Sequence, residues 1–269
     1  MSESFITHKP RKRFGQNFLT DPNIIRRIVS AIAPKKGQRL LEIGPGQGAI
    51  TRYLLQYEAD LTAVELDRDL AAILRNMFAA ETQFHLVEGD ALALDIAAIA
   101  SPDKPVRIVG NLPYNISTPL LFHLLKTQSC IVDMHFMLQK EVVDRLAAAP
   151  GSKDYGRLTV MVQYHCDVVP VFDVPPGAFY PPPKVMSAIV RLQPRPPKTM
   201  ADNLETLSQV VNAAFQQRRK TLRNTLKLLM PESVIVAAGI DPSARAETLS
   251  VSQFVGLANT LESLRLESR

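Results

Sequence analysis

The stretch RLLEIGPGQG, residues 39–48, decides the fold of this chain of 269 residues. An apolar strand at 39–43 runs into glycines at 44, 46 and 48, and a helical pattern follows from Ala49 to Gln56. Glycines at such a turn permit sharp bends and let a ligand approach main-chain N–H groups. The spacing GxGxG differs from the GxGxxG dinucleotide fingerprint, and there is no Walker lysine. The pattern predicts a ligand-binding loop at the carboxyl end of a buried strand.

Three further strands downstream also end in polar residues. Residues 61–64 lead into Glu65, residues 84–88 lead into Gly89-Asp90, and residues 106–109 lead towards Asn111. In open α/β sheets ligands bind at the carboxyl edge, where a carboxylate after the second strand can accept both hydroxyls of a ribose. An Asp side chain after the third strand can accept from an adenine amino group. This order predicts a site for a nucleoside that lacks a pyrophosphate.

The tetrapeptide NLPY, residues 111–114, offers chemistry for a nucleobase amine. Such an amine is a poor nucleophile because its lone pair is delocalised into the ring. The Asn111 amide oxygen and the Pro113 carbonyl can accept its two N–H bonds and free that lone pair, and proline has no N–H to compete. Tyr114 offers a flat surface for stacking an extruded base. Taken alone, the tetrapeptide fits a strand-to-helix turn with a buried tyrosine equally well.

Together these motifs resemble those of the rRNA adenine N6-dimethyltransferases, most closely the bacterial small-subunit enzymes of the KsgA/RsmA type. No position expected to carry chemistry departs from the family pattern. The glycine loop is shared by many methyltransferases, whereas FGQNFL and NLPYNIS are specific to this family. The matching segments are FGQNFL (14–19), EIGPGQG (42–48), ELD (65–67), GDA (89–91), NLPYNIS (111–117), FYPPPKV (179–185) and RRKTLR (218–223).

The resemblance implies a Rossmann-like class I methyltransferase that uses S-adenosyl-L-methionine. In this family the aromatic of FxPxPKV faces the NLPY tyrosine across the target base, so we expect Tyr114 and Phe179 to sandwich it. Glu42 is interpreted as a polar group near the glycine loop. The residues expected at the reacting centre are Asn111, Pro113, Tyr114 and Phe179. The residues expected to bind the cofactor are Asn17, Leu19, Gly44, Gly46, Gly48, Glu65, Asp90 and Asn111.

The implied substrate is a pair of adjacent adenosines in the 3′-terminal hairpin loop of small-subunit (16S) rRNA, within an assembling ribosomal particle. The sequence raises three alternatives. Methylation of large-subunit rRNA, giving antibiotic resistance, or of DNA keeps the same chemistry. A factor that monitors ribosome assembly, with secondary catalysis, would use the same RNA-binding surfaces. A nicotinamide dehydrogenase conflicts with the glycine spacing and lacks residues for hydride transfer.

Positive charge is concentrated in two parts of the chain. Residues 1–20 hold four Lys or Arg against one acid, and residues 191–230 hold eight against two, whereas the rest hold 19 against 23. Such patches bind polyanions through phosphate contacts and counterion release, although a basic run is often only a solvated face. The spacing of apolar residues predicts one continuous helix over 211–229 with a row of cations beside its apolar face. The residues expected to bind RNA are Arg11, Lys12, Arg13, Arg218, Arg219, Lys220, Arg223 and Lys227.

Alternating strand and helix patterns predict an α/β fold, with a mostly parallel, doubly wound sheet and a small all-helical C-terminal domain. Strands are expected near 39–44, 61–65, 84–88, 106–110 and 132–138, and two more at 158–164 and 185–192 as an antiparallel edge pair. Prolines at 175–176 and 181–183 predict a stiff connection that holds Phe179. We place the methyltransferase domain at 1–196, with a basic arm at 1–20, and a helical RNA- or ribosome-binding domain at 197–269.

The remaining composition favours a cytoplasmic protein. The two cysteines, Cys130 and Cys166, stand in apolar surroundings and are interpreted as buried free thiols. The first residues lack the apolar core of a signal peptide, and no apolar run reaches membrane-spanning length. The five histidines show no ligand spacing, so no metal is predicted. We expect a monomer, since no heptad or long apolar stripe is left over.

Overall fold

The computed structural model of the protein describes residues 16–113 and 116–267. The chain forms two compact units, and each is built from two stretches of sequence. The first unit comprises Met1–Val143 and Val168–Pro194, and the second comprises Asp144–Asp167 and Arg195–Arg269. The sequence predicted a single division between residues 196 and 197. The structure differs because residues 144–167 pack with the C-terminal helices.

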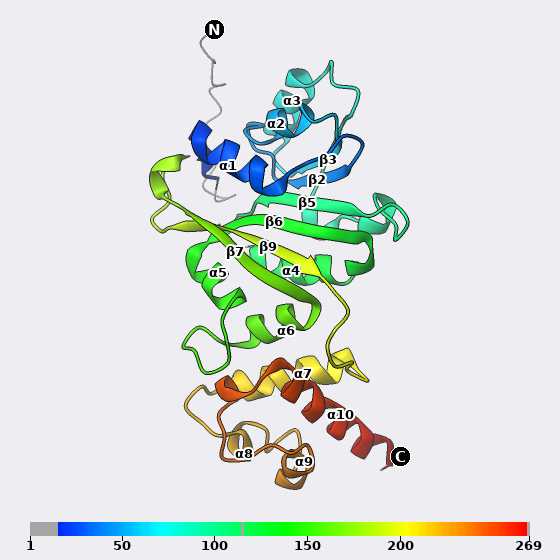
Figure 1. The fold of residues 1–269 in the computed structure, drawn as a ribbon, viewed down its shortest axis with the longest axis vertical. Coiled ribbons are helices and arrows are strands. Elements are labelled where there is room, and N and C mark those ends of the chain that lie inside the picture. The colour runs from blue at the N-terminus through cyan, green and yellow to red at the C-terminus, as the bar shows by residue number, and fades with distance from the viewer. Residues whose placement is uncertain (1–15, 114–115, 268–269) are drawn as a thin grey trace. The chain divides into compact units, whose positions relative to one another are not determined.

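A seven-stranded sheet forms the centre of the first unit (Figure 1). Its order is β4-β3-β2-β5-β6-β9-β7, and the first five strands in that order are parallel. Within this sheet, β6 pairs antiparallel with β9. The bounds are β2 (Arg39–Ile43), β3 (Asp60–Glu65), β4 (Phe84–Glu88), β5 (Val106–Asn111), β6 (Ile131–Gln139), β7 (Cys166–Val174) and β9 (Ser187–Pro194). The predicted doubly wound, mostly parallel sheet is confirmed.

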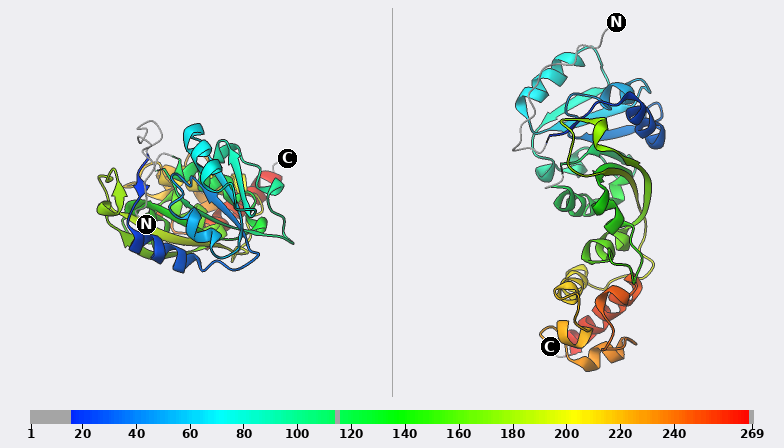
Figure 2. Two further views of the ribbon diagram at one scale, coloured as in Figure 1. Left: turned by 90° about the horizontal axis from the view of Figure 1, so that it is seen from above. Right: turned by 90° about the vertical axis from the view of Figure 1, so that its left-hand side faces the viewer.

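Helices lie on both faces of this sheet (Figure 2). The first begins where the sequence supplies a cap, because the Asp21 carboxylate accepts from the main-chain N–H groups of Asn23 and Ile24 and Pro22 occupies the first turn. The helices of this unit are α1 (Pro22–Ile32), α2 (Thr51–Leu55), α3 (Arg68–Met77) and α4 (Ser117–Leu125), and α5 (Lys140–Leu146) lies where the two units meet in sequence. Short 3₁₀ turns lie at η2 (Ala91–Ala93), η3 (Ile96–Ala98), η4 (Gln128–Cys130) and η5 (Pro176–Ala178).

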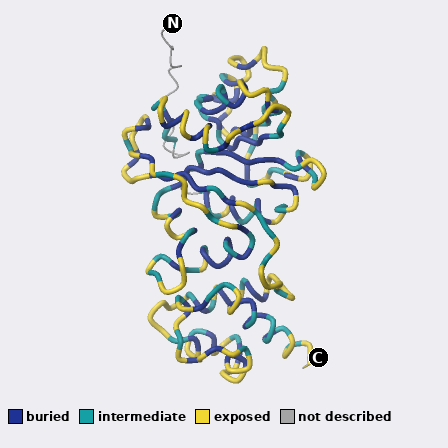
Figure 3. Tube along the Cα trace, in the orientation of Figure 1, coloured by how far each residue is buried: buried dark blue, intermediate teal, exposed yellow. Residues whose placement is uncertain are grey.

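The core of the first unit lies between the sheet and its helices (Figure 3). Apolar residues of β2 and β3, such as Leu40 and Leu61, are almost completely buried against α1 and α2. One buried ionic group links three strands: Arg107 of β5 donates two hydrogen bonds to Asp133 of β6, at 2.8 and 3.0 Å, and Arg191 of β9 donates to the same carboxylate at 3.1 Å. This group joins the antiparallel strand β9 to the parallel part of the sheet.

The second unit is helical. Its inner contacts include an aromatic series in which the Tyr155 and Phe215 rings lie 6.1 Å apart and the Phe215 and Phe254 rings 5.6 Å apart. Because Tyr155 precedes α6 and the other two rings come from α7 and α10, this cluster joins both stretches of the unit. The helices are α6 (Arg157–His165), α7 (Leu204–Phe215), α8 (Leu222–Thr225), α9 (Glu232–Ala237) and α10 (Val251–Glu267), with a 3₁₀ turn η6 (Ala246–Thr248).

Two predicted elements are wrong. The apolar run at 158–164 was expected to be a strand but forms α6, which begins after Gly156 and is stabilised by Thr159, whose hydroxyl accepts from the Gly156 N–H at 3.0 Å. The edge strand is instead β7, immediately afterwards, and β9 pairs with β6. The continuous helix expected over 211–229 is also interrupted, because α7 ends at Phe215 and a turn over 216–220 precedes α8.

Candidate active site at the strand ends

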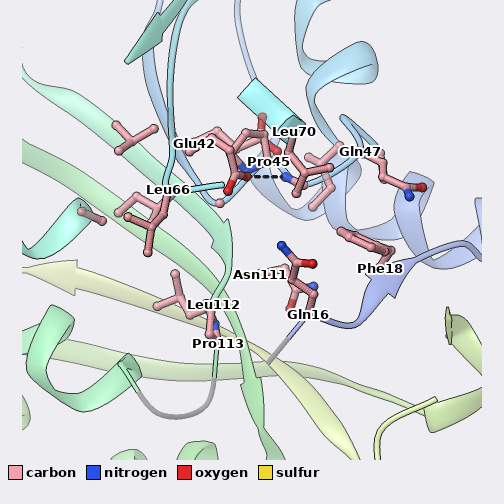
Figure 4. A pocket seen from close by; sticks show the side chains of 18 of the residues that line it. Gln16, Phe18, Glu42, Pro45, Gln47, Leu66, Leu70, Asn111, Leu112 and Pro113 are labelled. Atoms are coloured by element: carbon pink, nitrogen blue, oxygen red, sulfur yellow. Dashed lines mark hydrogen bonds between the residues drawn. The ribbon is translucent and has the colours of Figure 1, made fainter. Parts of the chain in front are cut away.

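A cavity opens at the carboxyl ends of the parallel strands (Figure 4). The glycine loop, the ends of β3 and β5, and the residues that follow β4 all line it, as does the segment Gln16–Leu19 that precedes α1. The structure therefore brings together most of the residues that the sequence singled out. The expected site residues that line the cavity are Asn17, Leu19, Gly44, Gly46, Glu65, Asp90, Asn111, Pro113 and Phe179. Tyr114 lies outside the described residues.

The glycine loop has the backbone that its sequence requires. Gly44, Gly46 and Gly48 have φ angles of +67°, +59° and +74°, in the left-handed region that other residues rarely adopt. A Cβ atom on Gly46 would lie 3.2 Å from the Phe18 ring. Gly48 does not line the cavity with the others, because its α-carbon faces Phe78, whose ring a Cβ would approach to 3.0 Å. Gly48 thus lets the glycine loop pack against Phe78, and its contact with a cofactor stays a prediction.

Glu65 ends β3 at the cavity wall, and both of its carboxylate oxygens are held by main-chain groups. Gly46 N–H donates to Oε2 at 3.1 Å and Asp67 N–H donates to Oε1 at 2.9 Å. Burial raises the pKa of Glu65 above its usual value, and these hydrogen bonds act against that rise. A carboxylate fixed in this way keeps lone pairs for further donors, such as a pair of ribose hydroxyls.

Glu42 is a second, fully buried carboxyl group at the cavity. It lies beneath the glycine loop, and the Thr51 hydroxyl donates to its Oε2 at 2.7 Å. The pKa of Glu42 is raised from 4.5 to about 7, because burial and, to a smaller extent, the charge of Glu65 raise it by more than the Thr51 hydrogen bond lowers it. Asp90, by contrast, is exposed at the end of the segment after β4, where its Oδ1 accepts from Leu92 N–H at 2.9 Å.

Asn111 ends β5 with its side-chain amide in the cavity (Figure 4). Its Nδ2 donates to the main-chain oxygen of Asn17 at 3.1 Å. This bond uses the donor end of the amide, so the oxygen is the end left to accept from a ligand. The Pro113 carbonyl accepts from Ile116 N–H at 3.2 Å and has a second lone pair.

Phe179 is held by a small second sheet. Strand β1 (Phe18–Leu19) pairs antiparallel with β8 (Phe179–Tyr180), with Leu19 opposite Phe179 and Phe18 opposite Tyr180. Phe179 is buried and lines the cavity, whereas Tyr180 is 68% exposed. The sequence predicted a stiff, proline-bounded connection here, and it did not anticipate the pairing with residues 18–19.

Two residues, Gln16 at the cavity wall and Asp67 behind it, were not proposed as site residues from the sequence. Gln16 lines the cavity, and its Nε2 donates to Asp67 Oδ2 at 3.1 Å. Asp67 also caps α3 by accepting from Asp69 N–H at 3.1 Å. Both stand inside the motifs FGQNFL and ELD, so their motif membership was the available signal, but nothing in the sequence links two residues 51 positions apart.

The expected RNA-binding residues that the structure describes all belong to the second unit. Arg218 donates to the main-chain oxygen of Lys153, and Arg223 lies 3.7 Å from a carboxylate oxygen of Glu232. Arg219, Lys220 and Lys227 are exposed at the turn after α7 and after α8. Arg11, Lys12 and Arg13 lie outside the described residues.

Three observations bear on other predictions. Among the described residues, no group of three or more His, Cys, Asp or Glu side chains is placed to hold a metal ion. None of the helices in the described ranges is long and apolar enough to cross a membrane. Cys130 and Cys166 are buried and unpaired, as predicted, and burial raises the pKa of the Cys166 thiol to about 12.

Comparisons with known proteins agree with this geometry. The family model described as "Ribosomal RNA adenine dimethylase" matches residues 7–263. Proteins named "Ribosomal RNA small subunit methyltransferase A" are similar over nearly their whole length. The one from Pseudomonas syringae pv. tomato is 57% identical over 97% of both chains, and the one from Methylococcus capsulatus is 56% identical over 95% of this chain and 99% of its own.

Solved structures give the same result. A dimethyladenosine transferase from Plasmodium falciparum superposes with a TM-score of 0.76 at 26% identity, covering 89% of this chain and 95% of its own. The 23S rRNA methyltransferase ErmE superposes with a TM-score of 0.69 at 29% identity, covering 91% of this chain and 100% of its own. The sequence match and the strand-end site agree, and the chain belongs to the ribosomal RNA adenine dimethylase family.

Proposed function

We propose that this protein transfers methyl groups from S-adenosyl-L-methionine to N6 of two adjacent adenosines in the 3′-terminal hairpin loop of small-subunit (16S) rRNA. The products are dimethyladenosines formed during ribosome assembly. The observation that carries the proposal is that Glu65 and Asn111 line one cavity, so a ribose-binding carboxylate and an amine-binding amide lie at one sheet edge. Relatives named for small-subunit rRNA methylation, at 57% identity, support the choice of RNA.

The residues of the cavity suit S-adenosyl-L-methionine. Gly44 and Gly46 leave main chain without side chains at the cavity wall, Glu65 offers acceptor oxygens for ribose hydroxyls, and Asp90 offers one for an adenine amino group. Asn17 and Leu19 line the same wall. When bound, this cofactor supplies an electrophilic methyl group on a sulfonium sulfur.

The chain's own residues act on the acceptor. Asn111 Oδ1 and the Pro113 carbonyl accept the two N6 hydrogens, which weakens conjugation of the nitrogen lone pair with the ring. Phe179, and Tyr114 by resemblance, hold the extruded base by stacking, which contributes about 1–3 kcal/mol per base. No strong general base is required, because the product ammonium loses its proton to water or a carbonyl. Catalysis comes mainly from alignment and exclusion of water, which can lower a barrier by about 7–11 kcal/mol.

The partner we infer is small-subunit rRNA within an assembling small subunit, bound in part by Arg218, Arg219, Lys220, Arg223 and Lys227. We infer action in the cytoplasm, as a monomer and without a metal. A second candidate is methylation of large-subunit rRNA, because ErmE has the same fold at 29% identity. The higher identity to proteins named for the small subunit favours the first.

The deciding experiment follows labelled methyl groups from S-adenosyl-L-methionine to three acceptors: unmethylated small subunits, large-subunit rRNA and duplex DNA. Digested nucleosides are identified by mass. Dimethyladenosine from small subunits alone is the expected result. Label in large-subunit RNA would favour the second candidate. Binding to particles with no label anywhere would contradict the enzymatic proposal and favour an assembly factor.

A further inference from the structure

The segment Gln16–Leu19, which we call the N-terminal clasp, touches both halves of the site. It lines the cavity but belongs to no strand of the central sheet, since β1 pairs with β8 alone. Phe18 and Leu19 are buried, so apolar packing holds the carboxyl end of the clasp, whereas a pairing of two residues by two residues gives it few main-chain hydrogen bonds. The polar bonds of the clasp therefore matter for its position.

The first of these bonds reaches the acceptor side of the cavity. Asn111 Nδ2 donates to the main-chain oxygen of Asn17 at 3.1 Å. The terminal torsion of an asparagine side chain is broad and has two nearly equivalent orientations, which differ in whether oxygen or nitrogen faces the ligand. The Asn17 carbonyl accepts hydrogen bonds only, so it selects the orientation with Nδ2 towards itself and Oδ1 as the free acceptor.

The second bond reaches the cofactor side. Gln16 Nε2 donates to Asp67 Oδ2 at 3.1 Å, and Asp67 is almost completely buried. Asp67 in turn donates its main-chain N–H to Glu65 Oε1 at 2.9 Å. Gln16 and Asn17 are adjacent in sequence, so one peptide bond separates the attachment to the β3 end from the attachment to the β5 end.

The Phe18 ring adds a third, apolar contact to the cofactor side. It lies so close to the α-carbon of Gly46 that a Cβ there would be 3.2 Å from it. Gly46 is itself bound to Glu65 through its N–H. The clasp is thus attached to the glycine loop and the β3 end on one side and to Asn111 on the other.

We propose that Gln16 is a positioning residue: through Asp67 it anchors the clasp so that the Asn17 carbonyl orients the Asn111 amide towards the acceptor. The inference rests on the proposed methyl transfer and adds a residue that acts through another. A donor is required at position 16 because its partner is a carboxylate. A glutamate there would place two carboxylates together and release the clasp.

The test first removes the hydrogen bond from Gln16 to Asp67 and then restores it with donor and acceptor exchanged. Gln16→Glu removes the donor, and it is expected to lower kcat by about ten- to a hundredfold, the scale of small misplacements in active sites. The dissociation constant of S-adenosyl-L-methionine, measured by calorimetry, is expected to rise by a smaller factor than kcat falls, because Glu65 and the glycine loop stay in place when the clasp is released. Adding Asp67→Asn to that variant restores kcat, because the new amide nitrogen donates to the introduced carboxylate while its oxygen still caps α3.

Two controls accompany the pair. Asp67→Asn alone is expected to retain activity, because the Gln16 amide can rotate to accept from the new amide. Asn23→Ala removes an exposed bond from Arg26, 2.7 Å long, at the start of α1, and it is expected to keep wild-type kcat. Together the two control variants distinguish an effect of losing the Gln16–Asp67 hydrogen bond from an effect of any substitution near the amino terminus.

Several outcomes would overturn the inference. Wild-type kcat in Gln16→Glu would show that the anchor is dispensable. A raised KM for S-adenosyl-L-methionine with unchanged kcat would make Gln16 a cofactor contact instead. A double variant no better than Gln16→Glu would refute the pairing with Asp67. All of these require that the wild-type protein transfers methyl groups, so an inactive wild type counts against the proposed function and is recognised separately.

Discussion

At the scale of single residues, the Asn111 amide has a different role at each end. Its nitrogen is bound to the Asn17 carbonyl, and its oxygen is available to an acceptor amine. One side chain therefore links the position of the N-terminal segment to the chemistry of the site.

Replacing Asn111 with alanine is expected to lower kcat by about 10²–10³-fold, the usual effect of removing one preorganised polar group, while most of the RNA affinity is retained. Asn111→Asp keeps acceptor oxygens but turns one of them towards the Asn17 oxygen, so it is also expected to lose turnover. Single-turnover kinetics and filter binding on small subunits measure the two quantities. Equal loss of affinity and turnover in Asn111→Ala would contradict the role.

The buried Glu42 predicts a dependence of stability on pH. Its pKa is raised from 4.5 to about 7 in the folded protein, so the folded state binds the proton more tightly than the unfolded chain does. The free energy of unfolding should therefore fall as pH rises from 4.5 through about 7. Glu42→Gln keeps an acceptor for Thr51 and removes the ionisation, so above pH 7 it should be more stable than wild type by roughly 3 kcal/mol, and nearly equal at pH 4.5.

Urea unfolding at several pH values measures this difference. Glu58→Gln, a change at an exposed carboxylate paired with Lys36, is the matched control and is expected to show no comparable gain. A pH-independent difference between Glu42→Gln and wild type would refute the explanation by burial.

The sequence alone could predict which residues meet at the cavity where those residues end a strand. Glu65, Asp90 and Asn111 follow apolar runs, and the rule for strand ends sufficed to group them. The packing of Gly48 against Phe78 was not predictable, because the spacing of a glycine loop does not reveal which glycine approaches another side chain. The bond between Gln16 and Asp67 was not predictable, since it depends on how distant segments meet.

At the scale of elements, the pairing of β2 with β5 sets the distance between the glycine loop and Asn111. Gly110 lies opposite Ile43 in this pairing, and a Cβ on Gly110 would lie 2.6 Å from the Ile43 main-chain oxygen. The strands can approach this closely only because residue 110 has no side chain.

Gly110→Ala is therefore expected to push the strands apart and to lower the free energy of unfolding by about 1–3 kcal/mol, as overpacking does. Gly256→Ala in α10, where a Cβ meets nothing within 4 Å, is the control and should be neutral or stabilising. Chemical denaturation measures both. A stability of Gly110→Ala equal to wild type would show that the strands can yield without cost.

The turn after α7 gives a graded prediction for RNA binding. All five cations are exposed, but Arg218 and Arg223 already contact Lys153 and Glu232. Alanine at Arg219, Lys220 or Lys227 is therefore expected to weaken RNA binding and to reduce the salt slope by about one for each phosphate that is no longer neutralised. The slope of affinity against salt, measured on small subunits, provides the check. Larger losses of affinity at Arg218 and Arg223 alone would reverse the assignment.

The elements that sequence periodicity identified correctly include the parallel strands, whose apolar runs end at a glycine or a polar residue. Residues 158–164 were misread because a short apolar run looks alike in a buried strand and a buried helix. The expected helix over 211–229 failed for a related reason. Val211, Leu222 and Leu226 are all buried, but they reach the core from two helices separated by a turn.

At the scale of the whole molecule, the second unit is completed by an insertion from the middle of the chain. Neither stretch forms the aromatic core of the second unit without the other, because the Tyr155 ring of the earlier stretch packs on Phe215 of the later one. A boundary drawn at residue 196 from proline content could not show this, since no local signal marks residues 144–167 as part of the later unit.

A chain that ends after residue 196 is therefore expected to expose the buried side of α6 and to bind the dye ANS or precipitate. Deleting Asp144–Asp167 as well, with a short Gly-Ser linker in its place, should restore solubility. Sedimentation and dye fluorescence distinguish the two shortened proteins. Equal solubility of both would contradict the division into units.

The pairing of β1 with β8 has a consequence for biosynthesis. Thr20 donates to Ala178, a residue 158 positions later, so the clasp leaves the ribosome long before its partner strand exists. At a typical rate of about 5–20 residues per second, that interval is on the order of 10–30 s. During it, Phe179 is absent from the cavity and β1 has no strand to pair with. We therefore expect the cavity of the nascent protein to stay incomplete until late in its own translation.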